Sequence, residues 1–213
     1  MSKLEAHAVS ISLDGYMAGP HQDESNPLGV GGTQLHEWIF ATESGREMIG
    51  ESGGSVGVDN DVVKRGFEGV GATIMGRNMF GPVRGPWNDS GWSGWWGERP
   101  PFHHPVFVLT HFERPALTLD DTTFYFVTEG IDEALARARV AAGDDIIRLG
   151  GGVETIREFL HTSQLDRLHV AVVPVRLEAG ERLFETVGEW PSGYECSSVT
   201  EGEGATHYEL VRN

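Results

Sequence analysis

A run of three glycines follows one predicted strand and precedes a predicted helix. Residues 145–149 (DIIRL) form the strand, Gly150, Gly151 and Gly152 follow, and helical spacing begins at 153. Glycine lets a backbone approach a ligand closely, and the free N–H groups at a helix start attract anions. The run is also typical of a tight turn without a ligand, and the residues alone leave both interpretations open. The pattern is not GxGxxG and comes late in the chain, which disfavours a standard dinucleotide-binding domain.

A second predicted strand, 72–75, also ends in glycine, and here an arginine comes next. Gly76, Arg77 and Asn78 follow this strand directly. A guanidinium group binds phosphate through a planar fork of charge-assisted hydrogen bonds. A surface ion pair is the ordinary alternative for an arginine in an acid-rich chain. Arg77 is therefore a candidate phosphate ligand.

A third predicted strand, 105–110, ends in polar and cationic residues. Thr110 and His111 stand at its end, and Arg114 lies close behind. Open α/β sheets place their ligands at the carboxyl ends of their strands. Three strand ends with chemistry suited to phosphate are more informative together than singly.

The charge of the chain restricts the classes of partner. Lys and Arg number 16 against 32 Asp and Glu, so the formal net charge is −16. Such a chain is not expected to bind nucleic acid or an anionic membrane over a broad surface. A phosphate must then be bound by a few local cations and backbone N–H groups. The start of the chain lacks a basic segment followed by an apolar stretch, so we expect no signal peptide and a cytoplasmic protein.

Cysteine and histidine patterns predict neither disulfides nor metals. Cys196 is the single cysteine, and its place in a predicted strand favours a buried or half-buried structural thiol. His103 and His104 are adjacent, so on an extended segment their side chains point to opposite sides. We therefore expect no metal site.

The hydrophobic periodicity predicts alternating strands and helices. The strands are expected at 6–13, 72–75, 105–110, 123–127, 145–149 and 168–175, the helices at 34–43, 60–69, 131–142 and 153–160, and a hairpin at 194–200 and 206–211. This alternation predicts an α/β fold with a central, mixed but mostly parallel sheet flanked by helices, and with an antiparallel C-terminal hairpin. No linker is visible, so we expect a single domain over 1–213.

Some local features carry further expectations. Thr33 is the predicted N-cap of helix 34–43, and Val62, Val63 and Phe67 are the expected inward residues of the next helix. The segments 20–32, 44–60 and 81–104 are predicted as long loops, which in compact domains usually have a function. The last one contains Trp87, Trp92, Trp95 and Trp96. These tryptophans are interpreted either as a lid over a flat heterocycle or as a self-packed loop or dimer contact.

The order of these motifs resembles a known family. SLDGYMAG, IMGRNMF, PVFVLTH, RLGGG and LDRLHVAVVPV follow one another as in the dihydrofolate reductase-like superfamily. The chain most resembles the riboflavin-biosynthesis reductase branch, the RibD C-terminal domain type in its stand-alone form. The resemblance covers nearly the whole chain and implies the three-layer dihydrofolate reductase-like fold.

The resemblance also implies an activity. It implies an NADPH-dependent oxidoreductase acting on a pyrimidine- or pterin-like heterocycle, with 5-amino-6-(5-phosphoribosylamino)uracil as the first candidate substrate and dihydrofolate as the second. Two alternatives belong to other classes: a non-catalytic NADPH-binding sensor, and a dimeric interaction protein whose tryptophan loop serves association. A homodimer is compatible with each of these interpretations.

Site residues follow from the resemblance position by position. The implied cofactor-binding residues are Gly15, Gly76, Arg77, Asn78, Thr110, His111, Arg114, Gly150, Gly151, Gly152, Val153 and Glu154. Ser12 and Asp14 would lie near the nicotinamide and the substrate, and Glu37 is a candidate for the acid of the first helix. Asp14 is equally well explained as the Asp of an Asp-Gly turn, and Glu37 as an exposed helix carboxylate.

Overall fold

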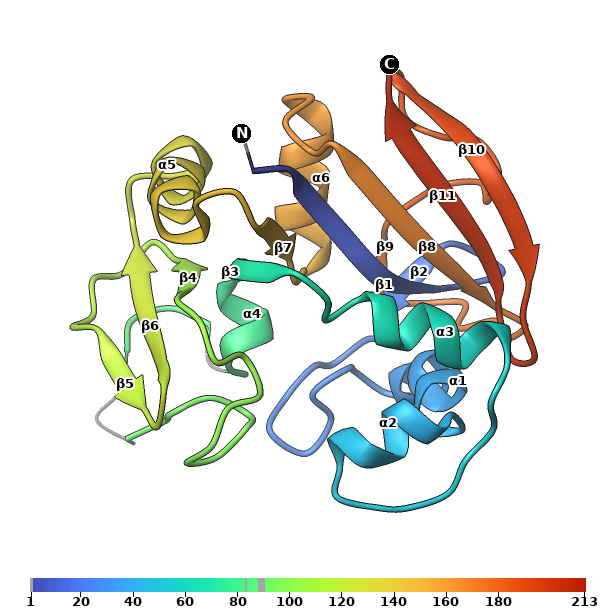
Figure 1. Ribbon diagram of the computed structural model, residues 1–213, viewed down its shortest axis with the longest axis horizontal. Helices are drawn as coiled ribbons and strands as arrows, with labels where there is room; N and C mark the ends of the chain where they lie inside the picture. The colour runs from blue at the N-terminus through green and yellow to red at the C-terminus, as the bar shows by residue number, and fades with distance from the viewer. Residues whose placement is uncertain (1, 83, 88–90) are drawn as a thin grey trace. The chain divides into compact units, whose positions relative to one another are not determined.

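The computed structural model describes residues 2–82, 84–87 and 91–213 (Figure 1). Its contacts divide the chain into two compact units. Unit 1 comprises Met1–Ala6 and Gly69–Leu165, and unit 2 comprises His7–Glu68 and Asp166–Asn213. The chain thus passes from unit 1 into unit 2, returns to unit 1 and ends in unit 2. The single domain expected over 1–213 stays a prediction.

Unit 1 is built on a mostly parallel sheet. Its strands are β3 (Val70–Gly76), β4 (Val106–Leu109), β5 (Leu117–Leu119), β6 (Thr122–Val127) and β7 (Ile146–Leu149). β3 pairs in parallel with β7 on one side and β4 on the other, and β4 pairs in parallel with β6. The short β5 is antiparallel to β6, and the first residues of β1 (Leu4–Ser12) pair in parallel with β7. The carboxyl ends of β3, β4 and β7 therefore lie at one edge.

The apolar runs of unit 1 are explained by burial on both faces of its sheet. Residues 72–76 of β3 are all buried, as expected for a central parallel strand. Helix α5 (Ile131–Ala142) packs against β3, β4 and β7, with Ile131, Ala134, Leu135 and Ala138 buried at helical spacing. The other helices are α4 (Arg77–Phe80) and α6 (Val153–His161). In the described part of the chain, no helix is long and apolar enough to cross a membrane.

Unit 2 contains the predicted C-terminal hairpin. β10 (Tyr194–Glu201) and β11 (Thr206–Arg212) are antiparallel, and β11 pairs in the same sense with β8 (Arg167–Val173). A separate two-stranded sheet joins β2 (Tyr16–Ala18) to β9 (Glu181–Arg182). The prediction of a mixed, mostly parallel central sheet with an antiparallel hairpin is confirmed.

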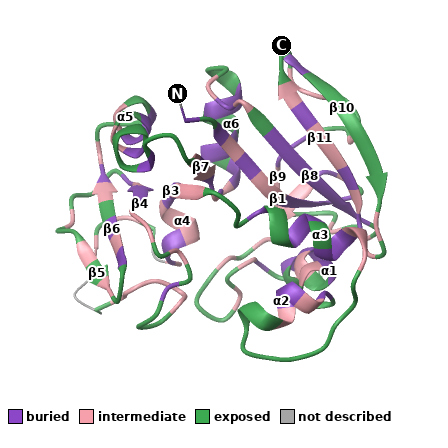
Figure 2. Ribbon diagram, in the orientation of Figure 1, coloured by how far each residue is buried: buried purple, intermediate pink, exposed green. Residues whose placement is uncertain are grey.

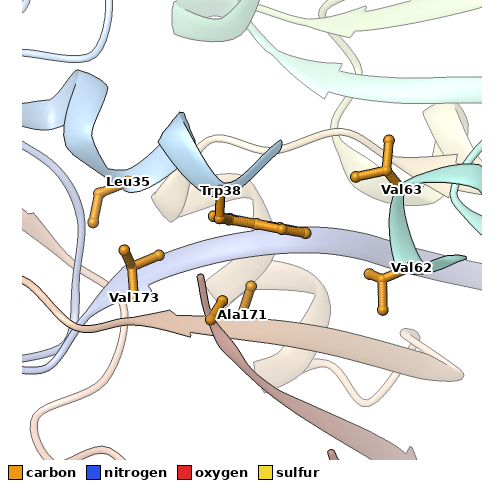
Figure 3. Close-up of a cluster of buried hydrophobic side chains, with 7 residues drawn as sticks. Leu35, Trp38, Val62, Val63, Ala171 and Val173 are labelled. Atoms are coloured by element: carbon orange, nitrogen blue, oxygen red, sulfur yellow. The ribbon is translucent and has the colours of Figure 1, made fainter. Parts of the chain in front are cut away.

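Short helices cover the core of unit 2. They are the 3-10 helix η1 (Gly32–His36), α1 (Glu37–Phe40), α2 (Glu43–Met48) and α3 (Val58–Arg65). Their apolar residues meet those of β8 in one cluster, shown in Figure 3, which includes Leu35, Trp38, Val62, Val63, Ala171 and Val173. The indole N–H of Trp38 donates to Ser10 Oγ over 2.9 Å, so its buried polar atom is satisfied.

The predicted helix 34–43 is wrong in its boundaries. The segment is a 3-10 turn followed by the four-residue α1, and α2 begins at Glu43 and extends into the predicted loop 44–60. The helical segment is preceded by Gly31 and not capped by Thr33, whereas Thr42 is the N-cap of α2 and accepts from Gly45 N. A capping residue inside a helical pattern thus starts a new helix.

Two burial predictions are also wrong. Phe67 is 42% exposed, because α3 ends at Arg65 and Phe67 no longer belongs to its inward face. Cys196 is an exposed free thiol. Every residue of β10 after Tyr194 is exposed, and Figure 2 shows most of the strand in green. Because neither face of this edge strand is covered, side chains that point to either face are exposed.

Candidate functional site

The predicted site residues form two groups. The predicted cofactor-binding residues other than Gly15 lie in unit 1, at or just after the carboxyl ends of β3, β4 and β7. Ser12, Asp14, Gly15 and Glu37 lie in unit 2. Each group has its own geometry.

In unit 1 the glycines after β7 are joined to the end of β3. The peptide between Gly151 and Gly152 is cis. Gly150 N donates to Ile74 O over 2.8 Å, and Gly76 N donates to Gly151 O over 2.6 Å. A Cβ on Gly76 would collide with Oγ1 of Thr155 on α6, so a larger residue here would have to displace that side chain. The two hydrogen bonds make the two glycine motifs, which are separate in the sequence, adjacent in the structure.

The start of α6 is open to a ligand. Gly152 is its N-cap, with φ −81°, and no side chain caps the helix there. A Cβ built on Gly152 would meet nothing within 4 Å. Val153 turns its side chain into the core, and the carboxylate of Glu154 accepts from Arg157 over 2.8 Å. The backbone N–H groups at this helix start, among them those of Val153 and Glu154, are therefore suited to hold an anion.

Among the described residues, Arg77 has no polar partner for its charge. In the described part of the chain, none of its guanidinium nitrogens Nε, Nη1 and Nη2 has a hydrogen-bond acceptor, although all three are buried. The guanidinium carbon lies 3.0 Å from the centroid of the Trp87 ring. Burial, together with the charge of Arg114, lowers the pKa of Arg77 to about 10, so the side chain remains cationic at neutral pH. A buried cation in this state favours an incoming anion.

Arg114 lies against the same indole. Its Cζ is 4.7 Å from the Trp87 centroid, and its Nη2 donates to Trp92 O over 2.6 Å. Burial lowers the pKa of Arg114 below its ordinary value. Sequence reasoning named both arginines but not Trp87 as the ring that they share. The signal for that ring was the aromatic enrichment of its loop.

The remaining unit 1 candidates have more ordinary surroundings. Thr110 N donates to Val127 O over 3.0 Å, and Thr110 Oγ1 accepts from Phe112 N over 3.2 Å, which shapes the turn after β4. His111 is exposed at that turn, and Asn78 is half-buried on α4. These residues border the arginines in sequence, and their contact with a cofactor stays a prediction.

In unit 2 the carboxylate of Asp14 accepts hydrogen bonds from its own turn and from a distant segment. Ser12 Oγ donates to it over 2.6 Å, and the backbone N–H groups of Leu177 and Glu178 donate over 3.2 and 2.9 Å. Burial works to raise the pKa of Asp14, but these hydrogen bonds outweigh it and the pKa is lowered. Asp14 is therefore an ionised acceptor that joins the turn after β1 to residues 177–178.

Gly15 and Glu37 complete the unit 2 group. Gly15 has φ +83°, and a Cβ there would collide with Phe184 O, so the close approach of two backbones explains the glycine. Glu37 is exposed at the start of α1. Its neighbour His36, which sequence reasoning did not single out, has a buried Nδ1 without a partner among the described residues, and burial lowers its pKa to about 4.

The tryptophan loop packs on the buried cluster of its own unit, unit 1. Trp87, Trp92 and Trp96 lie against the buried cluster Met75, Phe80, Val106, Val108 and Phe124. Trp87 Nε1 donates to Phe112 O over 2.8 Å and Trp92 Nε1 to Phe80 O over 3.0 Å. These are the contacts of a self-packed loop, and the interpretation of the loop as a lid stays a prediction. Residues 83 and 88–90 of the loop lie outside the described residues.

The adjacent histidines have different partners. His103 Nδ1 lies 2.7 Å from Asp121 Oδ2, and His104 Nε2 lies 2.7 Å from Thr73 Oγ1. Among the described residues, no group of three or more His, Cys, Asp or Glu side chains is arranged to hold a metal ion.

Comparisons with known proteins agree with the motif order. A family model described as the RibD C-terminal domain matches residues 7–200. A putative riboflavin biosynthesis protein from Shewanella sp. PV-4 is similar over 100% of this chain and 99% of its own, with a TM-score of 0.61 and 21% identity. A dihydrofolate reductase from Enterococcus faecalis, complexed with NADP(H) and RAB-propyl, is similar over 99% and 96%, with a TM-score of 0.51 and 18% identity. No curated protein matches. The two solved structures confirm the predicted dihydrofolate reductase-like fold.

Proposed function

The chain belongs to the family of the RibD C-terminal domain, and we propose that it is a reductase of the riboflavin-biosynthesis type that uses NADPH. The observation that carries the cofactor proposal is Arg77, whose buried guanidinium nitrogens have no acceptor among the described residues. An acidic chain of net charge −16 offers many carboxylates. A cation that pairs with none of the described carboxylates is suited to a phosphate ligand.

The residues of unit 1 fit a phosphorylated dinucleotide. The open backbone at Gly152 and the uncapped start of α6 would hold a diphosphate. Arg77 and Arg114 would hold the further phosphate that distinguishes NADPH from NADH. The cofactor supplies the hydride when bound. In this proposal unit 1 binds the phosphates of the cofactor.

The substrate side of the proposal rests on unit 2. Asp14 is held ionised by Ser12, Leu177 and Glu178, so its proposed role is that of a hydrogen-bond acceptor and not of a proton donor. Glu37 is exposed and stays a candidate acid. We propose a pyrimidine-type heterocycle, with 5-amino-6-(5-phosphoribosylamino)uracil as the first substrate to test. Dihydrofolate is the second, because one of the similar structures is a dihydrofolate reductase.

Cofactor binding by Arg77 variants tests the proposal. Arg77→Ala is expected to weaken NADPH binding about ten- to a hundredfold, because a charge-assisted contact is worth roughly 1.5–3 kcal/mol. NADH binding should change little. Arg137→Ala is the control, because Arg137 is a surface arginine of α5 paired with Glu133 and Glu129.

Two results would contradict the cofactor assignment. One is equal affinity of the wild-type protein for NADPH and NADH; the other is unchanged NADPH affinity in folded Arg77→Ala protein. NADPH oxidation with each of the two candidate substrates then distinguishes a reductase from a non-catalytic NADPH-binding sensor. NADPH binding without oxidation by either substrate would favour the non-catalytic sensor.

A further inference from the structure

The indole of Trp87 contacts two arginines that otherwise repel each other. Arg77 Cζ lies 3.0 Å and Arg114 Cζ 4.7 Å from its centroid. The charge of Arg114 contributes to the lowered pKa of Arg77. The negative face of an aromatic ring attracts a cation. Trp87 therefore supplies to both cations a weak form of the stabilisation that an anion would supply.

This arrangement leaves the hydrogen-bonding capacity of Arg77 unused. An aromatic ring stabilises the face of a guanidinium group, whereas a phosphate accepts from the N–H donors in its plane. All three Arg77 nitrogens are buried and have no acceptor in the described part of the chain. An anion cannot reach buried nitrogen atoms unless the atoms around them move.

Trp87 is the side chain that lies on the face of this guanidinium group. It is half-buried and lies in the loop after α4 rather than in a helix or strand. A hydrogen bond from its Nε1 to Phe112 O holds the indole, along with edge contacts to Phe80 and Phe126. Phe112 is itself 36% exposed. A side chain hydrogen-bonded to an exposed turn costs less to displace than one in the core.

We propose that Trp87 covers Arg77 in the free protein as a stand-in for an anion, and that a phosphate monoester displaces its indole to reach Arg77 and Arg114. This inference rests on the proposed function of the same site. Two cations match the double charge of a phosphate monoester near neutral pH. A ligand with a hydroxyl group instead of the phosphate would have to displace the indole without gaining the interactions with the two cations. Trp87 is thus a residue that sharpens selectivity for the phosphorylated ligand.

The first test measures binding of adenosine 2′-monophosphate by calorimetry, with adenosine as the uncharged control. Trp87→Ala is expected to bind the monophosphate roughly two- to thirtyfold more tightly than wild type, the range of a lost cation–π contact. Trp96→Phe is the matched control, since Trp96 packs on the same cluster and its ring contacts are to Phe102 and Phe124. Weaker binding by Trp87→Ala would overturn the inference and make Trp87 a platform for the ligand.

The second test uses the wild-type protein, so it does not depend on the folding of a variant. The Nε1–H of Trp87 donates to Phe112 O in the free protein, and its hydrogen exchange is measured by NMR. Saturating adenosine 2′-monophosphate should speed this exchange, because displacement breaks the bond. Slower or unchanged exchange would overturn the inference.

The experiments distinguish failure of the proposed cofactor site from failure of the inference about Trp87. If the monophosphate binds and Arg77→Ala abolishes the binding, the anion site stands, and the Trp87 results alone decide the inference. If the monophosphate and NADPH bind to neither wild type nor Trp87→Ala, both proposals are wrong.

Discussion

Arg77 and Asp14 are half-buried charges whose surroundings differ in a way that bears on function. Asp14 accepts from Ser12 Oγ and from two backbone N–H groups, all within unit 2. Arg77 has an aromatic ring but no acceptor among the described residues. A satisfied charge stabilises a turn, whereas an unsatisfied one favours a ligand. The structure thus separates two residues that the sequence presented as equal candidates.

Asp14→Asn is expected to lower the free energy of unfolding by about 1–2 kcal/mol at pH 7, because the amide group replaces one acceptor oxygen by a donor. The lowered pKa of Asp14 determines the pH dependence. The carboxylate's contribution is present above its unfolded-state pKa and is lost as the pH falls through the folded value. The difference between wild type and variant should therefore shrink under acid conditions. Urea unfolding at several pH values measures it.

The opposite result would restore the catalytic interpretation of Asp14. In that case stability and NADPH affinity would be unchanged, and turnover would fall roughly a hundredfold, the usual scale for loss of an acid–base group.

At the scale of elements, helix starts are satisfied in contrasting ways. The first N–H groups of α3 are met by a carboxylate from another part of unit 2: Glu203, in the turn between β10 and β11, accepts from Val58 N over 3.3 Å and from Asp59 N over 3.1 Å. At the start of α6, no side chain caps Gly152. An uncapped helix start beside open space is suited to a bound anion.

Gly152→Val tests that assignment better than a change at its neighbour Gly151. Gly151 has φ +113°, where a side chain is strained, whereas Gly152 has φ −81° and free space for a Cβ. We expect the variant to fold with a melting temperature near that of wild type and to lose at least about tenfold in NADPH affinity, since the new methyl groups would occupy the diphosphate position. Circular dichroism and cofactor titration measure the two effects. Normal affinity in a folded variant would exclude the helix start from the cofactor site.

At the scale of the whole molecule, a chain of buried histidines makes stability dependent on pH. Ala8 N donates to His169 Nδ1, so a neutral His169 carries its proton on Nε2 and donates it to His207 Nδ1 over 3.1 Å. His207 Nε2 then donates to Asp59 Oδ1 over 2.8 Å. Burial is the main reason that the pKa of His169 is lowered to about 2. The nearby side chains of His7, His207 and Arg65 lower it in the same direction. The folded protein holds this ring neutral.

Stability should therefore fall on mild acidification. An unfolded histidine takes up a proton near pH 6.5, whereas folded His169 does so only near its lowered pKa, so its contribution to stability is complete above pH 6.5 and declines below it. The expected slope from this residue is about 1.4 kcal/mol per pH unit. Urea unfolding from about pH 7.5 to about pH 5.5 should show a shallower decline in His169→Gln than in wild type. Parallel pH profiles would show that His169 does not carry the effect.

The sequence by itself determined the order of strands and helices. It also determined which strands end in residues suited to bind a phosphate. Apolar periodicity, glycine runs and turn residues are local signals, and α5, α6 and the C-terminal hairpin follow them closely. The same signals placed Gly76, Arg77 and the glycines 150–152 at strand ends, where the structure has them.

Only the tertiary structure decided what those residues contact. The Trp87 ring on Arg77 comes from a neighbouring loop, whereas the cap from Glu203 on α3 and the chain from Asp59 to His169 join segments distant in sequence. Exposure was decided in the same way: Cys196 is exposed because both faces of β10 are open to solvent. Periodicity within a segment tells which residues share a face, but whether that face is covered depends on other segments, so contact and burial arise only when the chain is folded.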